Sequence, residues 1–309
     1  MHYRQLGNTG ERVSVVSFGT APLGDMFGKA DEQVGIDAVR LALDAGITFF
    51  DSSPYYGNGL AEERLGKALA GHRDQVLIGT KAGRYGHDNF DFAPSRIRAS
   101  VEESLRLLGT DHVDILQLHD IEFVELDSIF TDSYGELVAL RDEGKCRFIG
   151  MSGYPINTLR RAISETDLDV VLSYSHSTLL DQCLGERLLP LAQDRGVGVI
   201  NAAAVALGLL TPGELRIDHP AGSEIRAAAG SVRAICADRG VDISFLANQF
   251  SIQRSGAATT LIGTVKPRHL KSAIDAADAP IDEQVLEAVL AATAKVSRLD
   301  WASGRPENN

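Results

Sequence analysis

The chain is poor in cysteine and in positive charge. Its 309 residues include only three cysteines, Cys146, Cys183 and Cys236, which form neither a CxxC motif nor a Cys/His zinc spacing. We therefore expect free thiols in a reducing compartment and no metal site. Thirty Lys and Arg residues face 42 Asp and Glu residues, a net charge of −12. This surplus repels phosphate backbones, so the composition argues against a nucleic-acid partner.

Long apolar segments are also scarce. The opening residues, MHYRQLGNTG, contain no apolar core of a signal peptide, which favours a cytoplasmic protein. Residues 196–213 carry no charge and approach the length of a membrane-spanning helix, but five glycines or prolines interrupt them. We interpret this stretch as a buried strand followed by a loop of small residues, and we predict no membrane association.

Short apolar runs alternate with longer amphipathic stretches along the chain. The predicted strands span residues 15–19, 47–51, 76–80, 113–118, 147–151, 170–174, 197–201 and 259–262. The predicted helices span residues 31–45, 61–70, 94–108, 135–143, 156–165, 184–194, 223–239, 244–253 and 267–276. Eight strand–helix units predict a parallel sheet closed into a (β/α)8 TIM barrel, with residues 1–309 as one domain. An open doubly wound sheet is the alternative, but the sequence lacks a G-x-G-x-x-G fingerprint.

Three segments lie outside the eight units. An N-terminal β-hairpin around residues 8–10 is expected to plug the bottom of the barrel. Residues 282–296 are predicted to form an extra C-terminal helix, and residues 303–309 to fray.

Reactive side chains follow successive predicted strands. Asp51 ends the second strand and precedes Tyr56, Lys81 follows the third strand, and His119 follows the fourth. Each residue alone has an ordinary structural interpretation, as a helix cap, a packed ring, a surface lysine or a core histidine. Because the carboxyl ends of barrel strands face the active site, the four residues together favour one common site.

The four side chains suit proton transfer to and from an oxygen. A phenol has an ordinary pKa of about 10, and a nearby ammonium lowers that pKa by stabilising the phenolate. Asp51 would hold the Lys81 ammonium, Tyr56 would transfer the proton, and His119 would orient the substrate oxygen.

The motifs that contain these residues resemble those of the aldo-keto reductase superfamily. They are F-F-D-S-S-P-Y-Y-G (49–57), T-K (80–81), L-Q-L-H (116–119), the opening L-G-x-T-G-x-x-V-S and G-L-L-T (208–211). The resemblance implies a (β/α)8 barrel that binds NAD(P) without a Rossmann domain, with Asp51, Tyr56, Lys81 and His119 as the catalytic tetrad.

Several departures narrow the resemblance. Ser152-Gly153 stands where most members have Ser-Asn, Ser173 stands where a Gln is common, and residues 201–204 offer no aromatic ring for the nicotinamide. One subgroup of the family shares these departures. It contains L-galactose dehydrogenase, the L-fucose or D-threo-aldose 1-dehydrogenases and pyridoxal 4-dehydrogenase. The segments H-D-I-E-F (119–123) and R-F-I-G-M-S-G-Y-P (147–155) also resemble this subgroup. The resemblance implies an NAD(P)-dependent oxidation of an aldose hemiacetal at C1 to the lactone.

The resemblance also implies the cofactor contacts. They are Gly19, Thr20, Asp51, Ser152, Gly153, Ser173, Ala202, Leu207, Leu209, Gly263, Thr264, Val265 and His269. Gly263 and His269 stand where NADP-preferring members have Lys and Arg, so we favour NAD over NADP, although Lys266 and Arg268 lie nearby.

Other functions remain open at this point. The chain could be an NADPH-linked aldehyde or ketone reductase, a pyridoxal 4-dehydrogenase, or a non-catalytic regulatory barrel like those of potassium channels. The sequence contains no HxH or HExxH motif, which argues against a metal-dependent hydrolase. We expect a small-molecule sugar or aldehyde substrate, bound by loops 26–29, 84–92, 121–123 and 209–219, and a monomer or weak homo-oligomer.

Overall fold

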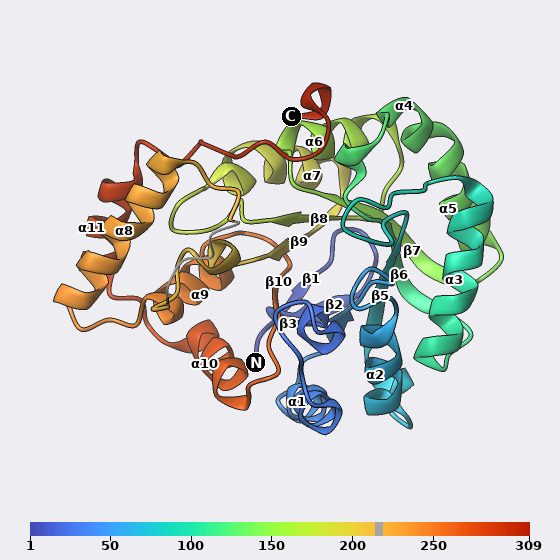
Figure 1. The fold of residues 1–309 in the computed structure, drawn as a ribbon, viewed down its shortest axis with the longest axis horizontal. Coiled ribbons are helices and arrows are strands. Elements are labelled where there is room, and N and C mark those ends of the chain that lie inside the picture. Colours follow the sequence, from blue (N-terminus) through green and yellow to red (C-terminus); the bar gives the residue numbers. More distant parts are fainter. Residues whose placement is uncertain (214–218) are drawn as a thin grey trace.

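The computed structural model describes residues 1–213 and 219–309 and confirms the predicted barrel. Parallel strands close in the order β10-β3-β4-β5-β6-β7-β8-β9. Figure 1 shows the helices arranged around this barrel. The strands are β3 (Val16–Gly19), β4 (Phe49–Asp51), β5 (Leu77–Ala82), β6 (Val113–Leu118), β7 (Cys146–Gly153), β8 (Val170–Tyr174), β9 (Gly198–Ala202) and β10 (Thr259–Ile262).

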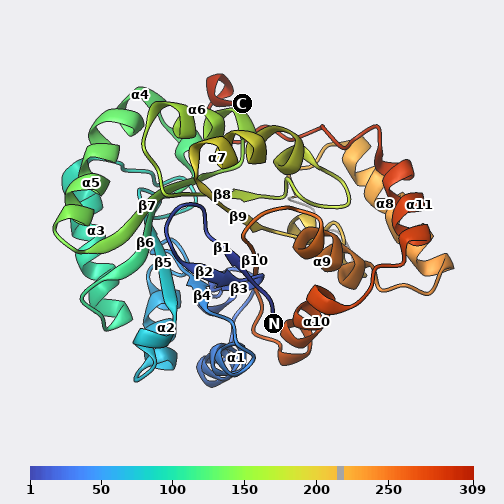
Figure 2. The ribbon, with the colours of Figure 1, turned by 180° about the vertical axis from the view of Figure 1, so that it is seen from behind.

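The helices follow the apolar periodicity of the sequence. They are α1 (Glu32–Asp44), α2 (Leu60–Leu69), α3 (Pro94–Leu108), α4 (Leu126–Ser128), α5 (Tyr134–Asp142), α6 (Ile156–Glu165), α7 (Leu189–Arg195), α8 (Ser223–Asp238), α9 (Ile243–Gln253), α10 (Pro267–Asp278) and α11 (Glu283–Thr293). Helix α11 is the predicted extra C-terminal helix. Figures 1 and 2 show that it packs beside α8 at one edge of the molecule, where the two share a separate apolar core.

Side chains alternate between the barrel interior and the helix layer along each strand. On β4, Phe49 belongs to the interior cluster, whereas Phe50 packs with the helices. On β8, Leu172 is interior and Val171 packs with the helices. This two-residue period fixes which strand-end residues reach the barrel mouth. The polar side chains that face inward at the barrel mouth are Asp51, Lys81, Gln117, His119 and Ser152.

The N-terminal hairpin closes the barrel bottom, as predicted. Strands β1 (Tyr3–Gln5) and β2 (Arg12–Ser14) pair antiparallel, and Leu6 is fully buried in the interior cluster. Gly7 has a φ of +52°, and a Cβ on it would lie 2.3 Å from the Gly198 nitrogen. Only glycine therefore allows the turn to sit against the start of β9.

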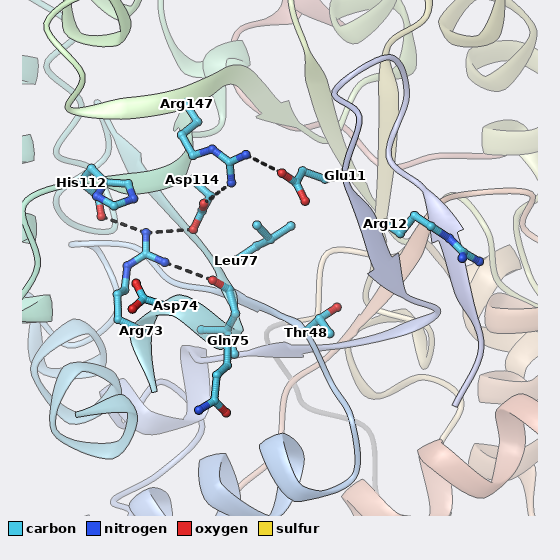
Figure 3. Close-up of a pocket in the computed structure, with 11 residues that line it drawn as sticks. Glu11, Arg12, Thr48, Arg73, Asp74, Gln75, Leu77, His112, Asp114 and Arg147 are labelled. Atoms are coloured by element: carbon cyan, nitrogen blue, oxygen red, sulfur yellow. Dashed lines mark hydrogen bonds and ion pairs between the residues drawn. The ribbon is translucent and has the colours of Figure 1, made fainter. Parts of the chain in front are cut away.

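A polar pocket of about 480 Å³ lies at this same end of the barrel (Figure 3). Asp114 accepts from Arg73 at 2.9 Å and from Arg147 at 2.8 Å, and Arg147 also pairs with Glu11 of the hairpin. Arg73 further donates to the carbonyls of Val76 and His112 at 3.1 Å. Because Arg73, Asp114, Arg147 and Glu11 pair with one another, we interpret the pocket as a structural network that ties the hairpin to the barrel.

The prediction that residues 303–309 fray is wrong. The Asn308 side chain donates to the carbonyls of Glu122 and Val124, each at 2.8 Å. The Asn308 carbonyl accepts from Thr158 at 2.5 Å. These bonds dock the tail beside the ends of β6 and β7, and Figure 1 places the C-terminus next to α6.

The three cysteines are buried and unbridged, which confirms the prediction of free thiols. Burial raises the pKa of both Cys146 and Cys183 to about 12. The described helices include none with the length and apolarity needed to cross a membrane.

Candidate active site

A buried ion pair forms the floor of the barrel mouth. Lys81 Nζ donates to Asp51 Oδ2 at 2.5 Å and to the Ser52 carbonyl at 2.8 Å. Gln117 Nε2 donates to the other Asp51 oxygen at 3.3 Å. Burial lowers the pKa of Lys81, but Asp51 and Tyr56 outweigh that effect and raise it. Lys81 is therefore a fixed ammonium.

The loop after β4 carries Tyr56 over this ion pair. Lys81 Nζ lies 5.1 Å from the centre of the Tyr56 ring. A Cβ on Gly24 would lie 2.4 Å from the Tyr56 carbonyl, so glycine is needed for the 3-10 turn Ala21–Gly24 to hold the loop. Thr20 anchors the start of the loop by donating to Ser52 Oγ at 2.8 Å.

His119 completes the group. Its Nδ1 lies 2.9 Å from Ser53 Oγ, and its ring meets the Tyr56 ring edge-on at 5.7 Å. Burial, then the charges of Lys81 and Arg84, hold the pKa of His119 well below its ordinary value. His119 is thus a neutral ring that can hydrogen-bond a substrate oxygen without carrying charge. The structure brings the four predicted catalytic residues together at one site.

The expected acidity of Tyr56 needs correction. We expected Lys81 to lower the Tyr56 pKa below that of an ordinary phenol. Instead, burial raises the pKa of Tyr56, and the opposing effect of Lys81 is smaller. Shielding from water, with the negative charges of Asp51 and Asp120, disfavours phenolate more than the Lys81 ammonium stabilises it.

Some of the expected cofactor contacts lie at the barrel mouth. Ser152 is inward, and its Oγ accepts from the Asp120 amide at 3.1 Å. A Cβ on Gly19 would lie 3.7 Å from Gly263, so the ends of β3 and β10 are side by side. Ala202 ends β9 and packs against the interior cluster.

Ser173 does not face the mouth. It shares its side of β8 with Val171, which packs with the helices, and its buried hydroxyl has no hydrogen-bond partner in the described part of the chain. The interior neighbours on this strand are Leu172 and Tyr174. The sequence interpretation placed Ser173 where a Gln would bind the carboxamide. That interpretation is therefore wrong by one residue along β8.

The loop after β9 leaves one of its two expected cofactor contacts exposed and buries the other. Leu209 is fully buried in the core shared by α8 and α11, so its side chain cannot reach a cofactor. Leu207 is 40% exposed and has a φ of 53°. Part of the expected substrate loop 209–219, namely residues 214–218, lies outside the described residues.

The start of α10 suits an anionic nucleotide. The segment from Gly263 to Val265 leads into this helix, whose N-cap, Lys266, provides no side-chain cap. Pro267 has no N–H, and the Lys266 and His269 amides already donate to Thr264 Oγ1 and the Lys266 carbonyl, so a phosphate here would be held mainly by side chains. Lys266 and Arg268 form no ion pair within residues 1–213 and 219–309, and His269 is exposed beside them. These residues therefore fit the phosphates of a dinucleotide.

Three site residues were not singled out by the sequence reasoning, although two of them, Arg84 and Glu122, fall within the expected substrate loops 84–92 and 121–123. Gln117 lies two residues before His119 on β6, so strand alternation alone could have placed it inside. Arg84 forms an ion pair with Asp120 beside His119. Glu122 is fully buried, and burial, together with Asp120, raises its pKa to about 8. No local pattern in the sequence indicates the Arg84–Asp120 pair or the burial of Glu122.

Comparisons with known proteins confirm the family. The aldo/keto reductase family model matches residues 15–293. L-galactose dehydrogenase of Arabidopsis thaliana is 40% identical over 99% of this chain and 98% of its own length. D-threo-aldose 1-dehydrogenase of a Pseudomonas species is 30% identical over 84% of this chain and 88% of its own. The holo form of the aldo-keto reductase AKR11C1 from Bacillus halodurans superposes with a TM-score of 0.80 at 26% identity, covering 100% of this chain and 99% of that one.

Proposed function

The chain belongs to the aldo/keto reductase family of NAD(P)-dependent oxidoreductases, and from this premise we propose that it oxidises an aldose. The reaction converts the cyclic hemiacetal at C1 to the lactone. The observation that carries the proposal is the joint placement of Asp51, Tyr56, Lys81 and His119 at the barrel mouth, in a chain similar to two aldose dehydrogenases.

The side chains have distinct roles in this reaction. His119 holds the C1 oxygen through its neutral ring, and Tyr56 accepts the hydroxyl proton as the C1 carbonyl forms. Lys81, fixed by Asp51, stabilises the phenolate that accepts this proton. The nicotinamide ring, when bound, supplies the acceptor for the C1 hydride.

We propose NAD as the preferred cofactor. The proposal rests on Gly263 and His269, which offer no cation at two positions where a 2′-phosphate would be held. Burial, then the charges of Arg268 and Lys266, lower the pKa of His269, so this side chain is neutral at neutral pH. Lys266 and Arg268 then serve the pyrophosphate that NAD and NADP share.

A sugar panel tests the proposal. We would measure reduction of NAD and of NADP with L-galactose, L-fucose, D-arabinose and pyridoxal, using Tyr56→Phe as the matched inactive control. The proposal predicts the highest kcat/KM for an aldose with NAD. It is wrong if no aldose reduces either cofactor while simple aldehydes are reduced efficiently by NADPH.

A further inference from the structure

An ion pair that the family chemistry does not require lies against the catalytic histidine. Arg84 NH1 donates to Asp120 Oδ2, and the two side chains are only 13% and 6% exposed. The same carboxylate oxygen lies 3.7 Å from His119 Nε2. A substrate oxygen bound to His119 would therefore lie next to this pair.

The surrounding structure holds Arg84 firmly. Its guanidinium carbon lies 4.2 Å from the centre of the Tyr55 ring, and 5.2 and 5.4 Å from those of Phe90 and Phe123. Those two phenylalanine rings stack on each other at 4.4 Å. Stacked rings on an arginine fix the plane of the guanidinium and hence the direction of its donors.

The backbone also supports this placement. Arg84 bridges to Phe90 in a small hairpin, in which the Asp91 amide donates to the Gly83 carbonyl at 2.8 Å. Gly83 has a φ of +99°, and a Cβ on it would lie 2.1 Å from the Phe92 ring. Asp120 itself adopts a left-handed conformation with a φ of 54°. Such conformations carry a conformational cost, and they cluster at functional sites.

The pair keeps unused hydrogen-bonding capacity. A guanidinium has five N–H groups, and among residues 1–213 and 219–309 Arg84 donates only to Asp120 and to the Gly86 carbonyl, the latter at 3.4 Å. Asp120 Oδ1 accepts no hydrogen bond from the described part of the chain. None of these atoms is among the buried polar atoms that lack a partner, so they remain open to water, and a ligand that replaces this water can use them.

We propose that Arg84 and Asp120 bind the hydroxyl on C2 of the substrate, the carbon next to the reacting carbon. Asp120 accepts the hydrogen of this hydroxyl, and Arg84 donates to its oxygen. Oxygens on neighbouring carbons lie close together, and His119 Nε2 is 3.7 Å from Asp120 Oδ2, so the C1 and C2 oxygens of one sugar can reach both side chains. This inference rests on the proposed aldose oxidation.

The pair also selects for a neutral substrate. An unpaired arginine would attract a carboxylate or phosphate, but Asp120 cancels that charge and repels anions. A hydroxyl both donates and accepts, so it is the group that satisfies an arginine and a carboxylate together. A neutral 2-hydroxy aldose therefore fits better than a sugar acid or a sugar phosphate.

The test compares L-galactose with 2-deoxy-L-galactose in the wild type and in Asp120→Asn. In the wild type, loss of the C2 hydroxyl should lower kcat/KM by about 10- to 150-fold, as for a hydrogen bond to a charged group. In Asp120→Asn, the ratio between the two sugars should be several-fold smaller than in the wild type, because the hydroxyl has lost its charged acceptor and keeps only the Arg84 donor. Arg84→Lys keeps the positive charge but loses the forked donors of the guanidinium. It should raise the KM for L-galactose and leave the KM for 2-deoxy-L-galactose nearly unchanged.

Two controls separate substrate binding from other effects. Asp114→Asn removes the carboxylate of the matched ion pair at the opposite end of the barrel and should leave the ratio between the two sugars unchanged. The Kd for NAD, measured by protein fluorescence, should be nearly unaffected by Asp120→Asn, and reduction of a simple aldehyde without hydroxyls should fall clearly less than oxidation of L-galactose.

Two outcomes overturn the inference. If Asp120→Asn discriminates between the sugars as strongly as the wild type, Asp120 does not bind the C2 hydroxyl. If Asp120→Asn slows the simple aldehyde as much as L-galactose, Asp120 acts only through His119. Failure of the wild type to oxidise any aldose would instead refute the proposed function, and the C2 assignment with it.

Discussion

The Asp51–Lys81 ion pair predicts a specific pattern of stability loss. Each side chain is almost fully buried, at 3% and 1% exposed, so removing one partner strands the other charge away from water. Breaking a buried pair in this way costs about 3–5 kcal/mol. We therefore expect Lys81→Met and Asp51→Asn each to lower the free energy of unfolding by roughly that amount, with the larger loss for Lys81→Met.

The double variant distinguishes pairing from simple packing. When both charges are gone, no charge is stranded, so the two losses should not add. One cost remains, because the Ser52 carbonyl also loses the hydrogen bond that it accepts from Lys81. We expect the double variant to be about 3 kcal/mol more stable than the sum of the single losses predicts.

Urea denaturation followed by circular dichroism measures all four proteins. Turnover should be lost in each variant regardless of stability. In Lys81→Met, Tyr56 lacks the ammonium beside it, and in Asp51→Asn, the Lys81 ammonium lacks the carboxylate that fixes its position. Additive losses in the double variant would refute the argument, because they would mean that the two charges do not depend on each other.

Four further predictions follow from the site. Tyr56→Phe should lower kcat by about 10²–10⁴-fold and leave the Kd for NAD unchanged, as measured by steady-state kinetics and fluorescence; more than a tenth of wild-type kcat would exclude Tyr56 as the proton acceptor. Because the pKa of Tyr56 is raised above its ordinary value of 10.0, kcat/KM for oxidation should rise through the alkaline range, and a plateau below about pH 8 would contradict this. His269→Arg should narrow the preference for NAD by improving kcat/KM with NADP, and a wild-type preference for NADP would remove the basis of this prediction. Burial raises the pKa of Glu62 to about 7, so its contribution to stability is full below its ordinary value of 4.5 and is lost as pH rises toward 7. Glu62→Gln should therefore gain roughly 2–3 kcal/mol over the wild type at pH 8 and little at pH 4, in urea titrations.

Strand ends made the catalytic residues predictable. Asp51 and Lys81 come from strands that are adjacent in both the sequence and the barrel, so locating each strand end was enough to bring them together. The barrel itself followed from the strand–helix alternation. Both depend on short-range patterns, and such patterns survive even when the strand limits shift by one or two residues.

The face of each strand was harder to predict. Barrel strands are buried on both sides, so a run such as D-V-V-L-S-Y shows no alternation that would fix its phase. A one-residue error then exchanges the two faces, and this exchange put Ser173 in the cofactor site instead of the helix layer. On β4 the same problem did not arise, because Asp51 is the polar residue at the strand end.

Features that depend on distant partners could not be predicted. The tail 303–309 is polar and contains proline and glycine, a composition typical of frayed ends, yet its bonds to Glu122, Val124 and Thr158 hold it in place. The prediction that the pKa of Tyr56 is lowered was wrong for a related reason. The sequence identified Lys81 as the neighbouring charge, but it could not show how far the partly buried phenol is shielded from water.

The Arg84–Asp120 pair has one residue that the sequence could place and one that it could not. Asp120 follows His119 directly, so its position at the barrel mouth was available from the sequence. Its partner lies 36 residues earlier, in a hairpin that exists because Gly83 allows Phe92 to pack against the backbone. Catalytic residues at strand ends are thus set by the barrel, whereas residues that choose the substrate are set by loops whose contacts are long-range. Substrate choice within this family can therefore change through loops such as 84–92 while the Asp51–Lys81 floor stays the same.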